Sequence, residues 1–171
     1  MKPSDFLVDD PAPQRVLITS REELRDAVAI ALRVTERLVR VLHRDLAVFD
    51  LASVDATEAL SRVLLGHRGA RVRMLVDDPA WLDTRAARLR MLQQRFPHAL
   101  ELRVASSDDP VGDDAHVLGD DHVALQVRPA PTARGDLWVR NKPHAQPLIA
   151  AFDRRWDAGV HNLAVFPLGL G

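Results

Sequence analysis

The chain has 171 residues, a formal net charge of −1 and no cysteine. Apolar residues make up 47% of it and charged residues 27%, which is typical of one soluble globular domain. The absence of cysteine excludes disulfides, thiolate nucleophiles and cysteine-ligated metal centres. The near-neutral charge predicts no strong general attraction to nucleic acid or anionic lipid. No apolar run approaches the length of a membrane span, so we expect no membrane partner.

Arginine outnumbers lysine by 21 to 2, and the two lysines are Lys2 and Lys142. Together with abundant alanine, leucine, valine and aspartate, this bias is typical of a GC-rich genome. Residues 1–10 lack the long apolar core of a signal peptide. We therefore expect a bacterial protein located in the cytoplasm.

Three segments of the chain differ in composition. Residues 1–14 hold three prolines and three aspartates and are predicted to form an N-terminal arm. Residues 15–159 carry the helix and strand patterns of one α/β domain. Residues 160–171 form an apolar tail, which we expect to pack into the fold or to meet a partner chain.

Strand patterns alternate with helix patterns in the first part of the domain. Ser20 and Glu23 form a capping box at one helix start, and Asp78 followed by Pro79 marks another. A helical alternative for residues 37–46 remains open, because their apolar spacing fits a strand only somewhat better. The predicted strands are 15–18, 37–46, 71–76 and 99–104, and the predicted helices are 20–36, 53–66 and 80–95.

The sequence pattern in the later part of the domain predicts a hairpin, a long loop and a last helix. An acidic segment, 106–121, carries six aspartates and neither lysine nor arginine. A strand at 122–128 is expected to pair with 115–118 across Gly119 and Asp120. The remaining predicted elements are a proline-marked loop, 129–147, with an apolar island at 137–139, and a helix, 147–158. These patterns predict a mixed sheet with helices on both faces.

The order of four segments resembles single-domain bacterial proteins related to one half of the phospholipase D superfamily. The segments are 15–24 (Arg-Val-Leu-Ile-Thr-Ser-Arg-Glu-Glu-Leu), 71–79 (Arg-Val-Arg-Met-Leu-Val-Asp-Asp-Pro), 95–97 (Arg-Phe-Pro) and 152–156 (Phe-Asp-Arg-Arg-Trp). The resemblance implies a phospholipase D-like single α/β unit. Because catalytic relatives bring two such units together, it also implies a homodimer.

Enzymes of that superfamily carry the motif His-x-Lys-x4-Asp, in which histidine attacks phosphorus and lysine neutralises the phosphate oxygens. With His116 in the histidine position, Leu118 takes the lysine position and Val123 the aspartate position. An alignment that places Asp120 in the aspartate position restores neither the histidine nor the lysine. The sequence therefore predicts no catalytic residues of this type.

Two other groups of residues have the chemistry of ligand sites. The aspartates of segment 106–121, with His116 and His122, are of the type that binds divalent metals, but the aspartate spacing matches no 12-residue calcium loop and the two histidines lack a third patterned ligand. We expect a solvated acidic loop, with no metal and no cofactor. Arginines could hold a phosphate in bidentate fashion, although alternating arginines are more often paired with nearby aspartates. The candidate ligand-binding residues are Arg71, Arg73, Arg85, Arg88, Arg103, His116 and His122.

Among these arginines, Arg85 is predicted to lie among the apolar residues of helix 80–95, where it must reach solvent or a buried carboxylate. The leading hypothesis is a non-catalytic interaction or binding module with a phospholipase D-like fold. The alternative is a protein that binds a phosphate-bearing ligand or nucleic acid through an arginine cluster. This alternative includes a protein that also hydrolyses the ligand. Convergence of the candidate arginines on one surface would favour this alternative.

Overall fold

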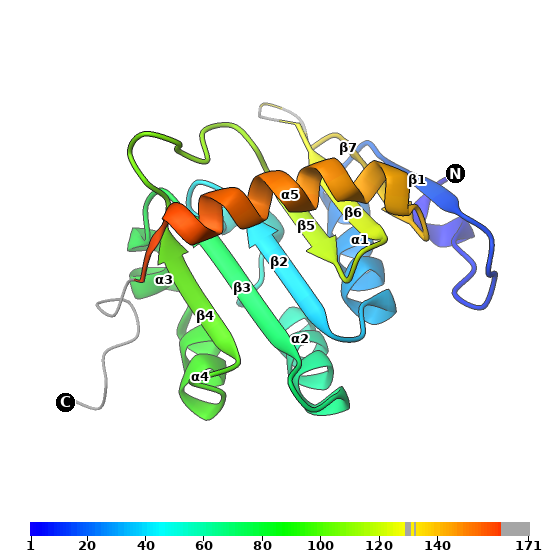
Figure 1. Cartoon of the computed structure of the whole chain (residues 1–171). Helices are drawn as coiled ribbons and strands as arrows, with labels where there is room; N and C mark the ends of the chain where they lie inside the picture. Colours follow the sequence, from blue (N-terminus) through cyan, green and yellow to red (C-terminus); the bar gives the residue numbers. More distant parts are fainter. Residues whose placement is uncertain (129–130, 132, 162–171) are drawn as a thin grey trace.

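An eight-stranded sheet forms the centre of the computed structural model, which describes residues 1–128, 131 and 133–161 (Figure 1). Its strands are β1 (Gln14–Ile18), β2 (Leu38–Leu42), β3 (Arg71–Val76), β4 (Leu100–Val104), β5 (His116–Gly119), β6 (Val123–Val127), β7 (Gly135–Val139) and β8 (Val160–His161). They lie in the order β1-β7-β6-β5-β2-β3-β4-β8. Strands β2, β3 and β4 are parallel to one another, and the other neighbouring pairs are antiparallel.

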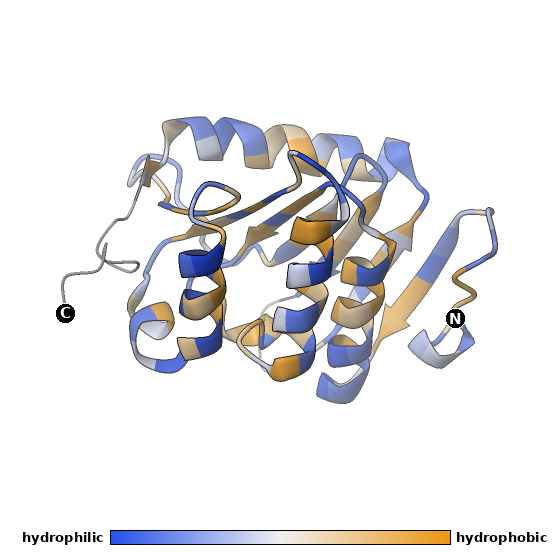
Figure 2. Ribbon diagram, turned by 90° about the horizontal axis from the view of Figure 1, so that it is seen from below, coloured by the Kyte–Doolittle hydropathy of each residue, from blue (hydrophilic) through white to orange (hydrophobic). Residues whose placement is uncertain are grey.

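Helices cover both faces of this sheet, so the predicted mixed α/β fold is confirmed. The helices are α1 (Arg21–Val34), α2 (Val54–Gly66), α3 (Ala80–Arg85), α4 (Ala87–Arg95) and α5 (Lys142–Ala158), with short 3-10 turns η1 (Pro3–Asp5) and η2 (Ala47–Phe49). Helices α1 to α4 pack on one face, and α5 lies across the other (Figures 1 and 2). Below, these two sides of the sheet are named the α1–α4 face and the α5 face.

Local sequence explains why α1 forms where it does. The Ser20 hydroxyl accepts the N–H of Glu23, and the Glu23 carboxylate accepts the N–H of Thr19, so the predicted capping interaction is present. Leu24 and Val28, one turn apart, are buried against the sheet. The strand predicted at 37–46 is also a strand, but it ends at Leu42, and the helical alternative is excluded.

Two predicted elements differ from the structure. The single helix predicted at 80–95 is divided at Ala86, whose backbone φ of −120° and ψ of 45° are not helical. The loop predicted at 129–147 is wrong in its second part, because residues 135–139 form β7 and α5 begins at Lys142. A proline tolerates the first turn of a helix, since the first N–H groups have no partner within the helix, and here Pro143 lies in that turn.

The two ends of the chain are described to different extents. Before β1, Pro3 is buried, and the carbonyl of Met1 accepts the N–H of Leu17. The tail predicted at 160–171 lies outside the described residues from position 162 onward. Among the helices that are described, none has the length and apolarity required to cross a lipid bilayer.

Candidate functional site

Polar side chains gather on the α5 face because successive strand residues point to opposite sides of a sheet. On β3, Val72 and Met74 are fully buried in the core of the α1–α4 face, whereas Arg71 and Arg73 are only partly buried. On β4, Arg103 occupies the register position opposite Leu75, a core residue of the α5 face. Three predicted candidates therefore lie on the same side of two adjacent strands.

The ring of Trp156 in α5 contacts two of these arginines, Arg73 and Arg103. Its ring is buried, and it stacks on Phe152 one helical turn earlier, with 5.8 Å between the ring centroids. The guanidinium carbon of Arg103 lies 4.5 Å from the Trp156 ring centroid, and that of Arg73 lies 5.6 Å from it. Arg103 Nη1 also donates to the Trp156 carbonyl at 2.7 Å. The indole thus positions both guanidinium groups at the end of α5 by cation–π contact.

Nearby carboxylates leave these charges unpaired. Asp153 is engaged by Arg40, whose Nε lies 3.0 Å from Oδ1. Glu101 is the register neighbour of Arg73 on β4. In the described part of the chain, however, no carboxylate oxygen lies within 4.0 Å of a guanidinium nitrogen of Arg71, Arg73 or Arg103. We name these three residues the arginine face.

Two buried donor atoms belong to the same surface. The Nε atoms of Arg73 and Arg103 are buried and have no hydrogen-bond partner among the described residues. Burying such a donor without a partner costs free energy. Because no carboxylate pairs with these arginines among the described residues, the expectation that the strand arginines pair with local aspartates is wrong for the arginine face.

Arg85 and Arg88 do not join the arginine face, since α3 and α4 lie on the opposite side of the sheet. The expectation that Arg85 lies among core residues is also wrong. The break at Ala86 ends α3 there, so that Ala86 is fully buried while Arg85 is exposed. Arg88 is likewise exposed and lines a shallow groove between α2 and α4 beside Met91.

The two candidate histidines lie apart, His116 at the start of β5 and His122 in the turn between β5 and β6. Burial lowers the pKa of His116, and the nearby Asp114 carboxylate offsets part of this effect. His122 has a buried Nδ1 without a hydrogen-bond partner among the described residues. Within residues 1–128, 131 and 133–161, no three acidic or histidine side chains are grouped so that they could hold a metal ion.

The acidic segment has partly exposed carboxylates, as expected of a solvated loop, and it also makes specific contacts that were not predicted. Arg155 of α5 bridges Asp109 and Asp114, with Nε 3.2 Å and Nη1 2.9 Å from the respective carboxylate oxygens. Burial alone would lower the pKa of Arg155, but these two hydrogen bonds outweigh it and raise the pKa. The hydrogen bond from Arg155 lowers the pKa of Asp109. Two further contacts hold the segment: Asp113 pairs with Arg44, and the Asp77 carboxylate accepts the N–H groups of Val111 and Gly112.

Asp120 stabilises the backbone in front of β2. Its carboxylate accepts the backbone N–H groups of Glu36, Arg37 and Leu38, so it holds the chain at the start of β2. With Asp120 in the aspartate position, the spacing of His-x-Lys-x4-Asp falls on Asp113 and Ala115. Neither residue has the chemistry of the motif, and the Asp120 carboxylate connects the β5–β6 turn to the backbone before β2.

A cleft that the sequence analysis missed lies at the carboxyl end of β2. It has a volume of about 500 Å³ and is lined by His43, Arg44 and Asp113, among others. His43 Nδ1 accepts the N–H of Leu46 at 3.0 Å, and burial lowers the pKa of this histidine. The sequence could have predicted this cleft, because His43 directly follows a buried parallel strand and ligands often bind at the carboxyl ends of such strands.

The fold is similar to solved structures that include a member of the phospholipase D family. Nuc from Salmonella typhimurium, described as that family member, matches with a TM-score of 0.67 and 16% identity, over 88% of this chain and 99% of Nuc. NucT from Helicobacter pylori matches with a TM-score of 0.60 and 10% identity, over 88% of this chain and all of NucT. At these identities the likeness shows the fold alone, and the predicted phospholipase D-like unit is confirmed at that level.

TrmBL2, described as an archaeal chromatin protein, matches with a TM-score of 0.63 and 11% identity, over 87% of this chain. The chain spans about half (54%) of TrmBL2. No curated protein matches the sequence. A family model described as "Domain of unknown function (DUF7931)" matches residues 20–165, and the chain therefore belongs to that family.

Proposed function

We propose that this protein is a non-catalytic binding module that holds the phosphate backbone of a nucleic acid on its arginine face. One observation carries the proposal: Arg71, Arg73 and Arg103 share a surface without a carboxylate partner among the described residues. Guanidinium groups donate planar pairs of hydrogen bonds that match phosphate oxygens. Three guanidinium groups on two strands, without a carboxylate partner among the described residues, therefore form a surface suited to an anion.

The spacing of the three charges favours a chain of phosphates over a single one. Alternate residues of a strand are about 7 Å apart, so Arg71 and Arg73 present separate points of positive charge. The near-neutral net charge of the chain indicates that binding depends on this local surface and is weak and salt-sensitive. Similarity to TrmBL2, whose description refers to a novel mode of DNA binding, supports nucleic acid as the ligand class.

The non-catalytic part of the proposal rests on the sequence. His116 is followed two positions later by Leu118 instead of lysine, and the chain has lysine only at positions 2 and 142. Lys142 pairs with Asp121, with 3.0 Å between Nζ and the carboxylate oxygen. Phosphoryl transfer needs fixed positive charge where negative charge develops, and the motif position does not supply it.

Fluorescence anisotropy with a labelled 20-nucleotide DNA, single-stranded and duplex, tests the proposal at about 50 mM salt. The double variant Arg73→Gln/Arg103→Gln should bind at least tenfold more weakly and reduce the slope of log K against log salt by about 2. The double variant Arg85→Gln/Arg88→Gln removes the same charge from the other side of the sheet and should bind like the unmodified protein. Absence of binding, or equal loss in both variants, would contradict the proposal.

The homodimer implied by the resemblance remains a separate proposal. Nuc is matched over 99% of its length, so one such unit makes up that whole chain, and a second copy is the partner that the resemblance implies. Light scattering at high micromolar concentration should give the mass of two chains. The mass of one chain would refute the dimer and leave the nucleic-acid proposal intact.

A further inference from the structure

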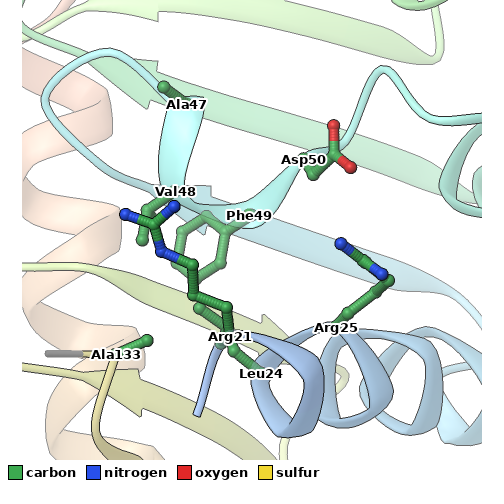
Figure 3. Close-up of a pocket in the computed structure, with 8 residues that line it drawn as sticks. All are labelled: Arg21, Leu24, Arg25, Ala47, Val48, Phe49, Asp50 and Ala133. Atoms are coloured by element: carbon green, nitrogen blue, oxygen red, sulfur yellow. The ribbon is translucent and has the colours of Figure 1, made fainter.

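A pocket opens between the start of α1 and the turn η2 on the α1–α4 face, on the other side of the sheet from the arginine face (Figure 3). Its volume is about 390 Å³, within the range of small-molecule sites. The apolar part of its wall is formed by Leu24, Val48 and Phe49. Leu24 and Phe49 are buried core residues, so this wall is fixed by the packing of the domain.

Charged groups lie around this apolar wall. Arg21 and Arg25, one helical turn apart on α1, both line the pocket, and Asp50 lies at the end of η2. In Figure 3, the Arg21 side chain extends beside Val48 and Phe49, and the Arg25 side chain extends toward the side where Asp50 lies.

Neither arginine has an ion-pair partner within 4.0 Å among the described residues, Asp50 included. Two guanidinium groups and one carboxylate give the described lining a net positive charge. The pocket therefore combines an apolar wall with unpaired hydrogen-bond donors of positive charge.

We infer that this pocket binds a small organic anion: a molecule with one carboxylate or phosphate group and an apolar body. The apolar body contacts the half-buried Val48, where it removes apolar surface from water, and lies against the floor that the buried Leu24 and Phe49 form. The anionic oxygens accept charge-assisted hydrogen bonds from Arg21 and Arg25. A cation would meet two like charges, and a neutral molecule would accept no hydrogen bond between opposite charges from either guanidinium group.

Isothermal titration calorimetry with three probes tests this ligand class. The probes are 4-phenylbutyrate, phenyl phosphate and the uncharged alcohol 4-phenylbutanol, which has the apolar body of the first without its charge. We expect the two anions to bind at least tenfold more tightly than the alcohol, because only the anions offer a charged acceptor to Arg21 and Arg25. The ratio of the affinities for 4-phenylbutyrate and phenyl phosphate identifies carboxylate or phosphate as the preferred head group. Equal binding of alcohol and anions would overturn the inference, and so would no binding of any probe.

Matched variants locate the binding. The double variant Arg21→Gln/Arg25→Gln should lose at least tenfold in affinity for the better anion. Arg33→Gln removes a charge from an exposed position in the last turn of the same helix, outside the pocket, and should bind like the unmodified protein. Ala47→Trp places a large ring at the pocket wall and should exclude all three probes.

Thermal unfolding of each variant shows whether the fold is intact. Equal loss of affinity in the Arg33 variant, or unchanged affinity in the double variant, would refute the assignment to this pocket. The pocket and the arginine face lie on opposite sides of the sheet, so either proposal can fail without the other.

Discussion

The two faces of the sheet are built from the same strands and differ in what covers them. On β3, Val72 and Met74 point into a core closed by four helices, and the alternating Arg71 and Arg73 point toward the side covered by α5. The α1–α4 face contains the larger apolar cluster, and the α5 face combines a smaller one with arginines, His116 and Gln126. The strand residues that point to the α1–α4 face therefore mainly stabilise the fold, whereas β3 and β4 place on the α5 face three arginines that have no carboxylate partner among the described residues.

Adjacent residues of β3 provide the most direct test of this division. Met74→Ala should lower the free energy of unfolding by about 2–5 kcal/mol, because it removes a fully buried side chain from the four-helix core. Arg73→Ala should lower it by about 1 kcal/mol or less, since a partly buried side chain loses mainly its contact with Trp156. Urea denaturation followed by tryptophan fluorescence measures both.

The same two variants should differ in the opposite sense in DNA binding. Under conditions where it is folded, Met74→Ala should bind DNA like the unmodified protein, and Arg73→Ala should bind more weakly. A stability loss for Arg73→Ala as large as that for Met74→Ala would break the division between the two faces.

Two neighbouring arginines of α5 should differ in how much they contribute to stability, by a smaller amount than the two β3 residues. Arg155→Ala should destabilise the protein by about 1–3 kcal/mol, because it removes the charged hydrogen bonds to Asp109 and Asp114. Arg154 is largely exposed and lies 3.5 Å from Asp109, so Arg154→Ala should change stability by less than about 0.5 kcal/mol. Limited proteolysis should also show faster cleavage within 105–115 for the Arg155 variant alone. Identical unfolding curves for both variants would show that the acidic segment is held by other contacts.

The pH dependence of stability should show the smallest effect. Burial lowers the pKa of His116 below its ordinary value near 6.5, so the unfolded chain takes up a proton more readily than the folded one. Its contribution to stability is therefore complete above about pH 6.5 and is lost as the pH falls through the folded pKa. His43 and His144, whose pKa values burial also lowers, act in the same direction.

His116→Gln should reduce the decline in unfolding free energy between pH 7 and pH 5, whereas His98→Gln, at an exposed loop position, should leave it unchanged. Chemical denaturation at several pH values measures this slope. A slope that His116→Gln does not change would assign the decline to other groups.

Local sequence predicted much of the fold because several elements carry unambiguous signals. The alternation in β3 and the Gly119-Asp120 turn of the β5–β6 hairpin specify their structures without long-range information. The start of α5 was missed, because Asn141 forms its cap with His144 inside a segment that prolines mark as a loop. The break at Ala86 follows no sequence signal that we recognise.

The candidate sites were harder to predict, because they depend on which strands become neighbours. Arg71 and Arg73 are close in sequence, but their proximity to Arg103 follows from the pairing of β3 with β4. The pocket beside η2 brings together the start of α1 and residues 47–50, and no local pattern reports such a contact. Arg21 and Arg25 therefore did not stand out among the other arginines.

The outer edge of β4 bears on whether two molecules can associate by pairing their sheet edges. Strand β8 pairs with Arg103 and Val104 and, in the described structure, leaves the outer side of Leu100–Leu102 without a neighbouring strand. Such an edge can template the addition of a strand from another molecule, and a charged side chain in its middle opposes this. Glu101 holds that central position, so we expect its charge to oppose the addition of a strand from a second molecule.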